Sequence, residues 1–124
     1  YILKKGGISL KKSNKSEYGI LLTELIRING ISQQSFYNEL GIGKPYFYDI
    51  VSGKANPPPP VTQLKILRIL KPNDKNKKLL LEIAANERNE MPADILIYLK
   101  KYPKTIDEIR NSKNYIKFMD KGEI

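Results

Sequence analysis

Apolar positions recur every three or four residues along most of this chain, which is the spacing of one buried face of an α-helix. No segment of useful length alternates apolar and polar residues, as a half-buried β-strand would. The pattern therefore predicts an all-α protein. Helices are expected over residues 17–28, 61–70, 74–89, 92–101 and 104–112, with two shorter helices between residues 31 and 57.

The segment from residue 31 to residue 57 carries two sets of helix start and stop signals in close succession. Ser32 can cap a first helix, and Gly41 can end it in the left-handed conformation. Gly43 and Pro45 suit the start of a second helix. The end of that helix is marked by Gly53, Asn56 and Pro57. Five apolar positions have the spacing that packs two helices across one turn: Phe36, Leu40, Ile42, Phe47 and Ile50. We therefore expect a helix-turn-helix.

The other predicted helices have similar start and stop signals. Ser16 can cap the helix over residues 17–28, and Asn29-Gly30 can stop it. The consecutive prolines Pro57–Pro60 impose an extended conformation, and we expect them to act as a stiff spacer before the next helix. The apolar faces of these helices are expected to include Ile28, Val61, Leu64, Leu67, Ile95, Leu96, Tyr98 and Leu99.

The chain divides into three parts. Residues 1–15 hold five lysines around two glycines and form a basic N-terminal arm. Residues 16–71 contain the helix-turn-helix, and residues 72–124 form a C-terminal helical extension, which we expect to dimerise or to bind a partner or effector. The last stretch, residues 114–124, is too apolar to remain in solvent and is expected to pack on its own chain or on a partner.

The net positive charge is confined to one part of the chain. Residues 1–78 carry fourteen Lys and Arg against five Asp and Glu, a net charge of +9, whereas residues 79–124 carry eight of each. A phosphate-binding face needs such segregation, because neutralised phosphates release counterions. The richness in Lys, Asn, Ile and Tyr also fits an AT-rich coding sequence. Charge alone therefore leaves a nucleic-acid partner and codon bias as alternatives.

Several classes of function are disfavoured. Cysteine and histidine are absent, which removes disulfides, thiolate zinc sites and histidine-based catalysis. Asp107 and Glu108 are adjacent in sequence, so they would not face each other on a helix. We expect no enzymatic activity, cofactor or metal. No apolar run approaches the ~20 residues of a membrane span, and no signal region is recognisable, so we expect a cytoplasmic protein that does not bind a membrane.

An ordered set of residues defines a family resemblance. It comprises Ile31-Ser32-Gln33, Phe36, Leu40-Gly41-Ile42, Tyr46-Phe47, Ile50, Gly53-Lys54, Asn56-Pro57 and the later Leu64, Ile66, Leu67 and Leu70. With this set, residues 16–71 resemble the lambda-repressor-like (Xre) helix-turn-helix domains of phage repressors, antitoxins and bacterial regulators. The resemblance implies a DNA-binding bundle of about five helices. The chain departs from the family at Val51, where glutamate is frequent, and at Tyr37, where a small residue is usual. We expect Tyr37 to point outward or to widen the helix crossing.

The resemblance implies that the second helix of the pair lies in the major groove, with its N-terminal residues at base edges. The candidate base-reading residues are Lys44, Pro45, Tyr46, Tyr48 and Asp49. Lys44 could donate to guanine, Asp49 could accept from cytosine, and either tyrosine could pack on a thymine methyl or reach a phosphate. The alternatives are a solvated or phosphate-bound Lys44, surface packing of the tyrosines, and an ion pair between Asp49 and Lys54.

Other residues would bind the DNA backbone. The candidate phosphate-binding residues are Gln33, Ser52, Lys54 and Asn56. Gln33 stands at the start of the first helix of the pair, where the helix N-terminus favours a phosphate. The basic arm could follow flanking phosphates or remain a free tail.

Two functions from different classes are consistent with these features. The first is a sequence-specific regulator of transcription that binds double-stranded DNA, of the phage-repressor type, and acts as a homodimer that represses a promoter by occluding it. A dimer is expected because one domain reads too few base pairs for specificity. The second is an antitoxin or inhibitor whose main partner is another protein, which the C-terminal helices would cover.

Overall fold

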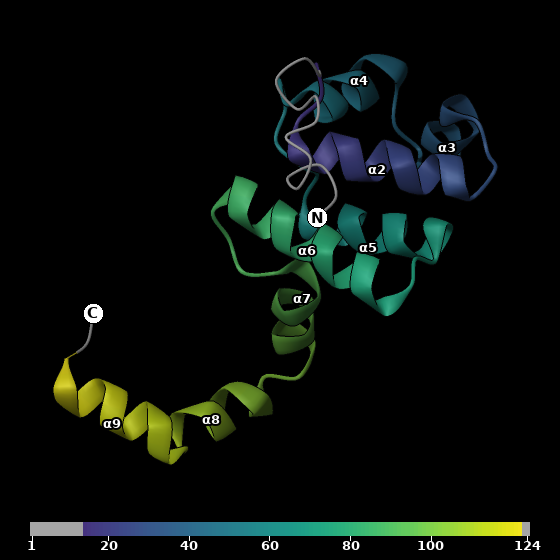
Figure 1. Cartoon of the computed structure of the whole chain (residues 1–124). Helices are drawn as coiled ribbons and strands as arrows, with labels where there is room; N and C mark the ends of the chain where they lie inside the picture. The colour runs from purple at the N-terminus through teal and green to yellow at the C-terminus, as the bar shows by residue number, and fades with distance from the viewer. Residues whose placement is uncertain (1–13, 123–124) are drawn as a thin grey trace.

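A computed structural model describes residues 14–122, which contain eight α-helices and no β-strand, so the predicted all-α class is confirmed. In chain order the helices are α2 (Glu17–Ile28), α3 (Gln33–Leu40), α4 (Lys44–Ser52), α5 (Pro60–Leu70), α6 (Asp74–Arg88), α7 (Ala93–Lys101), α8 (Lys104–Arg110) and α9 (Lys113–Lys121) (Figure 1). The predicted bounds agree to within one or two residues. The sequence pattern did not predict α9, which lies in the apolar C-terminal stretch.

The predicted caps are present at the helix ends. The hydroxyls of Ser16 and Ser32 each accept a hydrogen bond of 3.0 Å from the backbone N–H three residues further on. Gly41 and Gly53 end α3 and α4 with φ angles of 83° and 89°, in the left-handed region. These ends were predictable because each depends on the chemistry of only a few adjacent residues.

The core is built around α2, which packs against α3, α4 and α6. Of the five apolar positions predicted to join the short helices, four are buried, and Ile42 is partly buried. The core continues beyond residue 71, because Leu80, Ile83 and Ala84 of α6 belong to the same cluster as Tyr18, Phe36 and Phe47. The bundle from α2 to α6 therefore shares one core.

Two apolar residues predicted to be buried lie in solvent. Ile28 and Val61 are each 60% exposed. Ile28 is the last residue of α2, beyond the part of that helix that the neighbouring helices cover.

The buried face of α5 differs from the predicted one by about one residue. Its buried residues are Gln63, Ile66 and Leu70, at positions i, i+3 and i+7, whereas Leu64 and Leu67 are half-buried. α5 packs between α3 and α7, and these two contacts select the face that carries a glutamine. Apolar residues occur all around this helix, so composition did not identify its inner side.

Of the two alternatives expected for Tyr37, the structure excludes the outward orientation. Its side chain is only 8% exposed, and its ring centroid lies 5.4 Å from that of Phe47. The tyrosine ring therefore fills the space between α3 and α4, where aromatic pairs add to the energy of burial.

The proline run leads directly into α5, which begins at Pro60, and its first half packs into the bundle. Pro57 and Pro58 are fully buried. Gln63 Nε2 donates to the Pro58 carbonyl at 2.8 Å, and Arg88 Nη1 donates to the Pro57 carbonyl at 2.9 Å. The extended segment thus obtains from α5 and α6 the hydrogen bonds that it cannot form internally.

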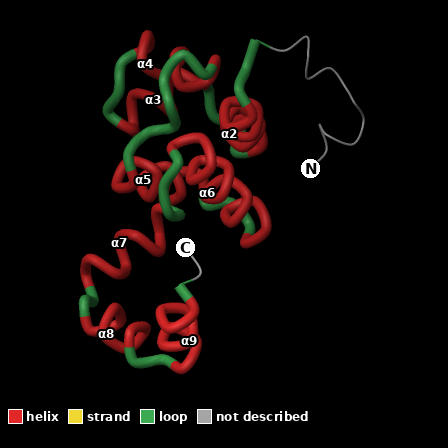
Figure 2. The backbone as a smooth tube through the Cα atoms, turned by 90° about the vertical axis from the view of Figure 1, so that its left-hand side faces the viewer, coloured by secondary structure: helices red, strands yellow, loops and turns green. Residues whose placement is uncertain are grey.

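The helices α7, α8 and α9 extend away from the bundle, beyond α5 and α6, in both views (Figures 1 and 2). α7 packs on α5 and α6, and α8 packs on α9. Ala93 is the only buried residue of α7, and neither α8 nor α9 has one. Ile95 and Tyr98 were predicted to be buried but are 46% and 51% exposed, while Leu96 and Leu99 are half-buried. Within residues 14–122, no helix is both long and apolar enough to span a membrane.

Candidate nucleic-acid interface

The turn between α3 and α4 determines how these helices meet. The N–H groups of Gly41 and Ile42 both donate to the Tyr37 carbonyl at 3.0 Å, which turns the chain at the end of α3. Under the turn, the ring centroids of the buried Phe36 and Phe47 lie 5.9 Å apart. Together with the Tyr37 ring, these contacts hold α3 against α4 through three aromatic side chains.

The helix α4 has a buried side and an exposed side. Phe47, Ile50 and Val51 are buried in the core. The candidate base-reading residues lie in the first six residues of α4, where four are exposed and Asp49 is half-buried. The exposed four are Lys44, Pro45, Tyr46 and Tyr48. The structure thus presents most of this predicted set to solvent on one short helix.

A hydrogen bond joins the two predicted sets of site residues. The Tyr48 hydroxyl in α4 donates to Gln33 Oε1 at 3.4 Å, and Gln33 is the first residue of α3. Because the amide oxygen of Gln33 accepts this bond, its NH₂ group retains its donors. The N-terminus of α3 adds a partial positive charge at the same place. A base-reading candidate and a phosphate-binding candidate are therefore adjacent.

The other phosphate-binding candidates follow α4. Ser52, Lys54 and Asn56 are exposed. The Ser52 hydroxyl donates to the Asp49 carbonyl at 3.3 Å and accepts from the Lys54 N–H at 3.4 Å, so its hydrogen is already engaged. No ion pair joins Asp49 to Lys54 in the part of the chain that the structure describes. Lys54 therefore keeps its charge available at the end of α4.

The C-terminal end of α4 is attached to the start of α2. The Val51 carbonyl accepts hydrogen bonds from the N–H of Ser16 at 2.9 Å and from its hydroxyl at 3.4 Å. Gly19 lies against the same carbonyl, where a side chain would not fit. The sequence reasoning did not single out Gly19, although a glycine inside a helical pattern is a signal of close approach.

A buried polar group lies behind α4. The hydroxyl of Tyr18 is buried and has no hydrogen-bond partner among residues 14–122. Burial raises the pKa of this hydroxyl, and the negative charge of Glu87 adds to the effect.

Glu87 of α6 connects the C-terminal half of the bundle to α2. Its Oε2 accepts a hydrogen bond from the N–H of Tyr18 at 3.3 Å, in the first turn of α2. This N–H is one of the donors that a helix leaves unsatisfied at its start. Burial raises the pKa of the Glu87 carboxyl above its ordinary value of 4.5, the bond to Tyr18 lowers it, and Glu17 raises it further, with a net upward shift.

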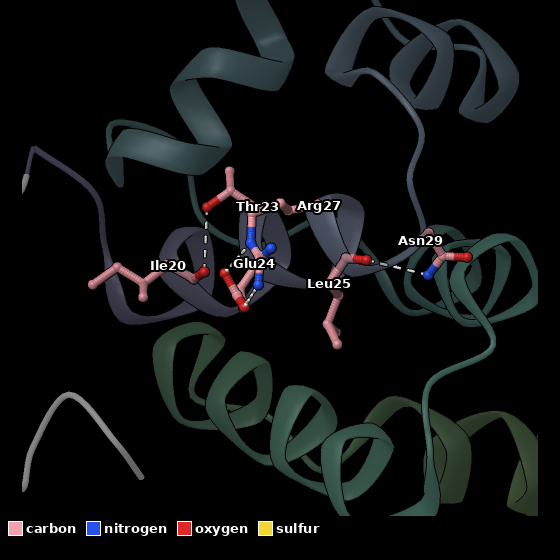
Figure 3. A network of polar contacts seen from close by, with 6 residues as sticks. All are labelled: Ile20, Thr23, Glu24, Leu25, Arg27 and Asn29. Atoms are coloured by element: carbon pink, nitrogen blue, oxygen red, sulfur yellow. Dashed lines mark hydrogen bonds and ion pairs between the residues drawn. The ribbon is translucent and has the colours of Figure 1, made fainter.

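Polar contacts along the rest of α2 pair its one cationic residue, Arg27, with a carboxylate (Figure 3). Arg27 Nε donates to Glu24 Oε1 at 3.0 Å, and this hydrogen bond lowers the pKa of Glu24. Asn29 Nδ2 donates to the Leu25 carbonyl at 3.1 Å (Figure 3) and to the Leu70 carbonyl at 2.9 Å. The end of α2 is thereby joined to the end of α5, and Arg27 is held by a carboxylate.

Two further expectations concern the basic N-terminal arm and metal binding. The lysines of the basic arm, apart from Lys15, lie outside the described residues. Lys15 donates to Thr23 Oγ1 at 3.2 Å, which places it beside α2. Within residues 14–122, no cluster of three or more acidic side chains could hold a metal ion.

Comparisons with models of protein families, with curated proteins and with solved structures gave no match. The interpretation of this surface therefore depends on its own residues and geometry.

Proposed function

We propose that this chain is a sequence-specific regulator that binds double-stranded DNA, with α3 and α4 as a lambda-repressor-like helix-turn-helix and α4 in the major groove. The observation that carries the proposal is the hydrogen bond from Tyr48 to Gln33. It brings the exposed side of α4 and the N-terminus of α3 onto one surface. In this mode of docking, one helix reads bases while the other is positioned on the backbone.

The exposed side of α4 supplies the base-reading groups. Lys44, at the start of the helix, donates to guanine O6 or N7, and Tyr46 packs on a thymine methyl. Tyr48 has its hydroxyl directed to Gln33, so it contributes its ring face and a free acceptor lone pair. Asp49 is half-buried and is the weakest of the five candidates for direct contact.

The phosphate contacts flank α4 on both sides. The Gln33 amide donates to one backbone phosphate at the N-terminus of α3. Lys54 and Asn56, both exposed beyond the end of α4, bind another. Ser52 has a secondary role, because its hydroxyl hydrogen already serves the Asp49 carbonyl.

The attachment of α4 to the bundle supports this function. Phe47 and Ile50 bury one side of the helix, and the Val51 carbonyl is held by Ser16. A recognition helix that is fixed before binding loses little conformational entropy when it docks. The regulator acts as a homodimer on two half-sites about one helical turn apart, and it represses transcription by occluding a promoter.

The proposal is tested by selecting from a pool of random-sequence DNA duplexes with the full chain, followed by a salt series on the enriched and scrambled duplexes. We expect a recurrent motif and binding at least about 10³-fold tighter than to the scrambled duplex. Equal, weak and steeply salt-dependent binding to every duplex would show phosphate attraction alone and would refute sequence-specific recognition.

A further inference from the structure

Helix α9 (Lys113–Lys121) separates its apolar and cationic side chains onto opposite sides. With about 3.6 residues per turn, its apolar residues fall on one side and its lysines recur every four residues on the other. The apolar residues are Tyr115, Ile116, Phe118 and Met119, and the lysines are Lys113, Lys117 and Lys121. Ile116, Phe118 and Met119 are between 41% and 50% exposed. Such a concentration of apolar groups on one side of a helix marks an interaction surface.

The bundle does not cover the apolar side of α9. This helix packs on α8, and neither of the two contains a buried residue. It lies at the far end of the chain from α3 and α4 (Figures 1 and 2). A helix shorter than ~12–15 residues is marginal in water unless its apolar side is packed. Since α9 has nine residues, we expect another surface to cover it.

The arm that carries α9, defined as residues 93–121, is cationic. It holds seven Lys and Arg against four Asp and Glu, a net charge of +3, whereas the rest of residues 79–124 holds one arginine against four Glu. Arg110 pairs with Asp107 at 3.9 Å, but none of the six lysines of the arm forms an ion pair within residues 14–122. The surface that covers α9 is therefore expected to be anionic.

We propose that α9 lies in the surface of a membrane that contains anionic lipids, with its apolar side among the outer parts of the acyl chains. A helix with lysines on its polar side and aromatic and aliphatic residues on the other is the type that binds in this plane. The long apolar stems of the lysines allow their ammonium groups to reach the lipid phosphates beside the helix. Each such lysine adds to the attraction by the anionic surface.

Other occupants would satisfy only one side of α9. A second copy would bring together two arms that each have a net charge of +3, and their repulsion opposes this contact. DNA would attract the lysines but would leave Phe118 and Met119 in water. A groove in another protein would bury the apolar side but would not reach the lysines on the opposite side. An anionic membrane engages both sides at once.

This inference goes beyond the proposed function and concerns a surface separate from α3 and α4. It departs from the expectation, based on spans and signal regions, that the protein does not bind a membrane. A helix that lies in the membrane surface does not need the length of a span, and no helix within residues 14–122 has that length. Because the apolar side of α9 is small, we expect the binding to be reversible.

The first test is co-sedimentation of the full chain with lipid vesicles. We expect binding at least about tenfold tighter to phosphatidylcholine vesicles with about one-quarter phosphatidylglycerol than to phosphatidylcholine alone. The double variant Ile116→Ser, Phe118→Ser keeps the charge and should weaken this binding by at least about tenfold. The matched control is Val61→Ser, at an apolar position of α5 that is 60% exposed, which should leave the binding unchanged.

A second measurement shows which side of α9 enters the membrane. The chain has no cysteine, so a single polarity-sensitive dye can be attached through an introduced thiol. Met119→Cys places the dye on the apolar side, and Lys117→Cys places it on the cationic side. With the anionic vesicles, the emission of the dye at residue 119 should shift to shorter wavelength, whereas the dye at residue 117 should not shift.

Three results would overturn the proposal. The first is a lack of binding to the anionic vesicles. The second is binding that the double serine variant leaves unchanged, since this would reflect the charge of +9 on residues 1–78, or an equal shift of both dyes. The third is a dimer in solution that the double serine variant dissociates, which would assign the apolar side to a second copy.

The DNA selection is independent of these outcomes. The double serine variant should enrich the same DNA motif as the original chain, because α9 is remote from α4 (Figure 1). A failure to bind vesicles together with a recurrent motif would refute this inference alone. Vesicle binding through α9 without any DNA preference would refute the proposed function alone.

Discussion

Gly19 in α2 lies so close to Val51 in α4 that a Cβ atom on residue 19 would stand 1.9 Å from the Val51 carbonyl oxygen. The same oxygen accepts the N–H of Ser16 at 2.9 Å, so the backbone of α4 cannot move away without losing a hydrogen bond. The position of α4, and with it the exposed surface of Lys44 and Tyr46, depends on the absence of a side chain at residue 19.

Gly19→Ala should therefore destabilise the protein by about 1–3 kcal/mol or more, because the two helices must separate to admit the methyl group. Urea unfolding followed by circular dichroism measures the change. The control is Gly43→Ser, which also adds a Cβ but meets only Pro45 Cδ at 3.7 Å. It supplies an N-cap hydroxyl to α4 and should be neutral or slightly stabilising. Equal stability of both variants would contradict the close approach of α2 and α4.

Lys44 and Lys54 should have different effects on DNA binding. Lys44→Ala should cost about 1–3 kcal/mol on the selected motif and relax the preference at one base pair. Lys54→Ala should weaken binding to all duplexes alike and reduce the slope of log affinity against log salt by about 1. Fluorescence anisotropy over a salt series separates the two effects. Lys78→Ala, an exposed lysine of α6, is the charge control. The same loss for all three lysines would indicate a general charge effect.

Gln63→Leu should destabilise the protein although it places an apolar side chain at a position that is only 4% exposed. The Pro58 carbonyl would lose the donor that Gln63 Nε2 provides at 2.8 Å, and an unsatisfied buried acceptor costs about 1–3 kcal/mol. Thermal and urea unfolding would measure the loss. Val61→Ala, in the exposed part of the same helix, should change stability by no more than about 0.5 kcal/mol. A larger effect at Val61 than at Gln63 would show that the buried face of α5 is the one predicted from composition.

Glu87→Gln should stabilise the protein at neutral pH, and the gain should disappear in acid. Burial raises the pKa of Glu87 above its ordinary 4.5, so the folded state favours the protonated form. The stability that this proton contributes is present below pH 4.5 and is lost as the pH rises through the raised pKa. Glutamine is neutral throughout and still accepts the N–H of Tyr18.

The effect is measured by urea unfolding of the Glu87→Gln variant and of the original chain, from below pH 4.5 to neutral pH. The difference between their free energies of unfolding should grow as the pH rises. The matched control is Glu82→Gln, at an exposed position of the same helix. A difference that is constant with pH, or that grows toward acid, would refute the role assigned to burial of Glu87.

The positions of the helix ends could be predicted from the sequence because each is settled within one or two turns. The Ser16 and Ser32 hydroxyls bond to backbone groups three residues away, and Gly41 and Gly53 adopt left-handed conformations that glycine adopts more readily than other residues. The same local chemistry placed Lys44 and Tyr48 near the start of an amphipathic helix, and the structure shows both exposed there.

Local sequence chemistry could not predict which face of each helix is buried, or which helices contact each other. Tyr37 fills the crossing of α3 and α4 because Phe47 offers it a ring to pack on, and Gln63 is buried because Pro58 presents a carbonyl there. These partners are brought together by packing, and periodicity along one helix does not identify its neighbours. Local hydrogen bonding and backbone preference thus set where each helix begins and ends. Packing against other helices decided which face is buried, and why residue 19 must be glycine.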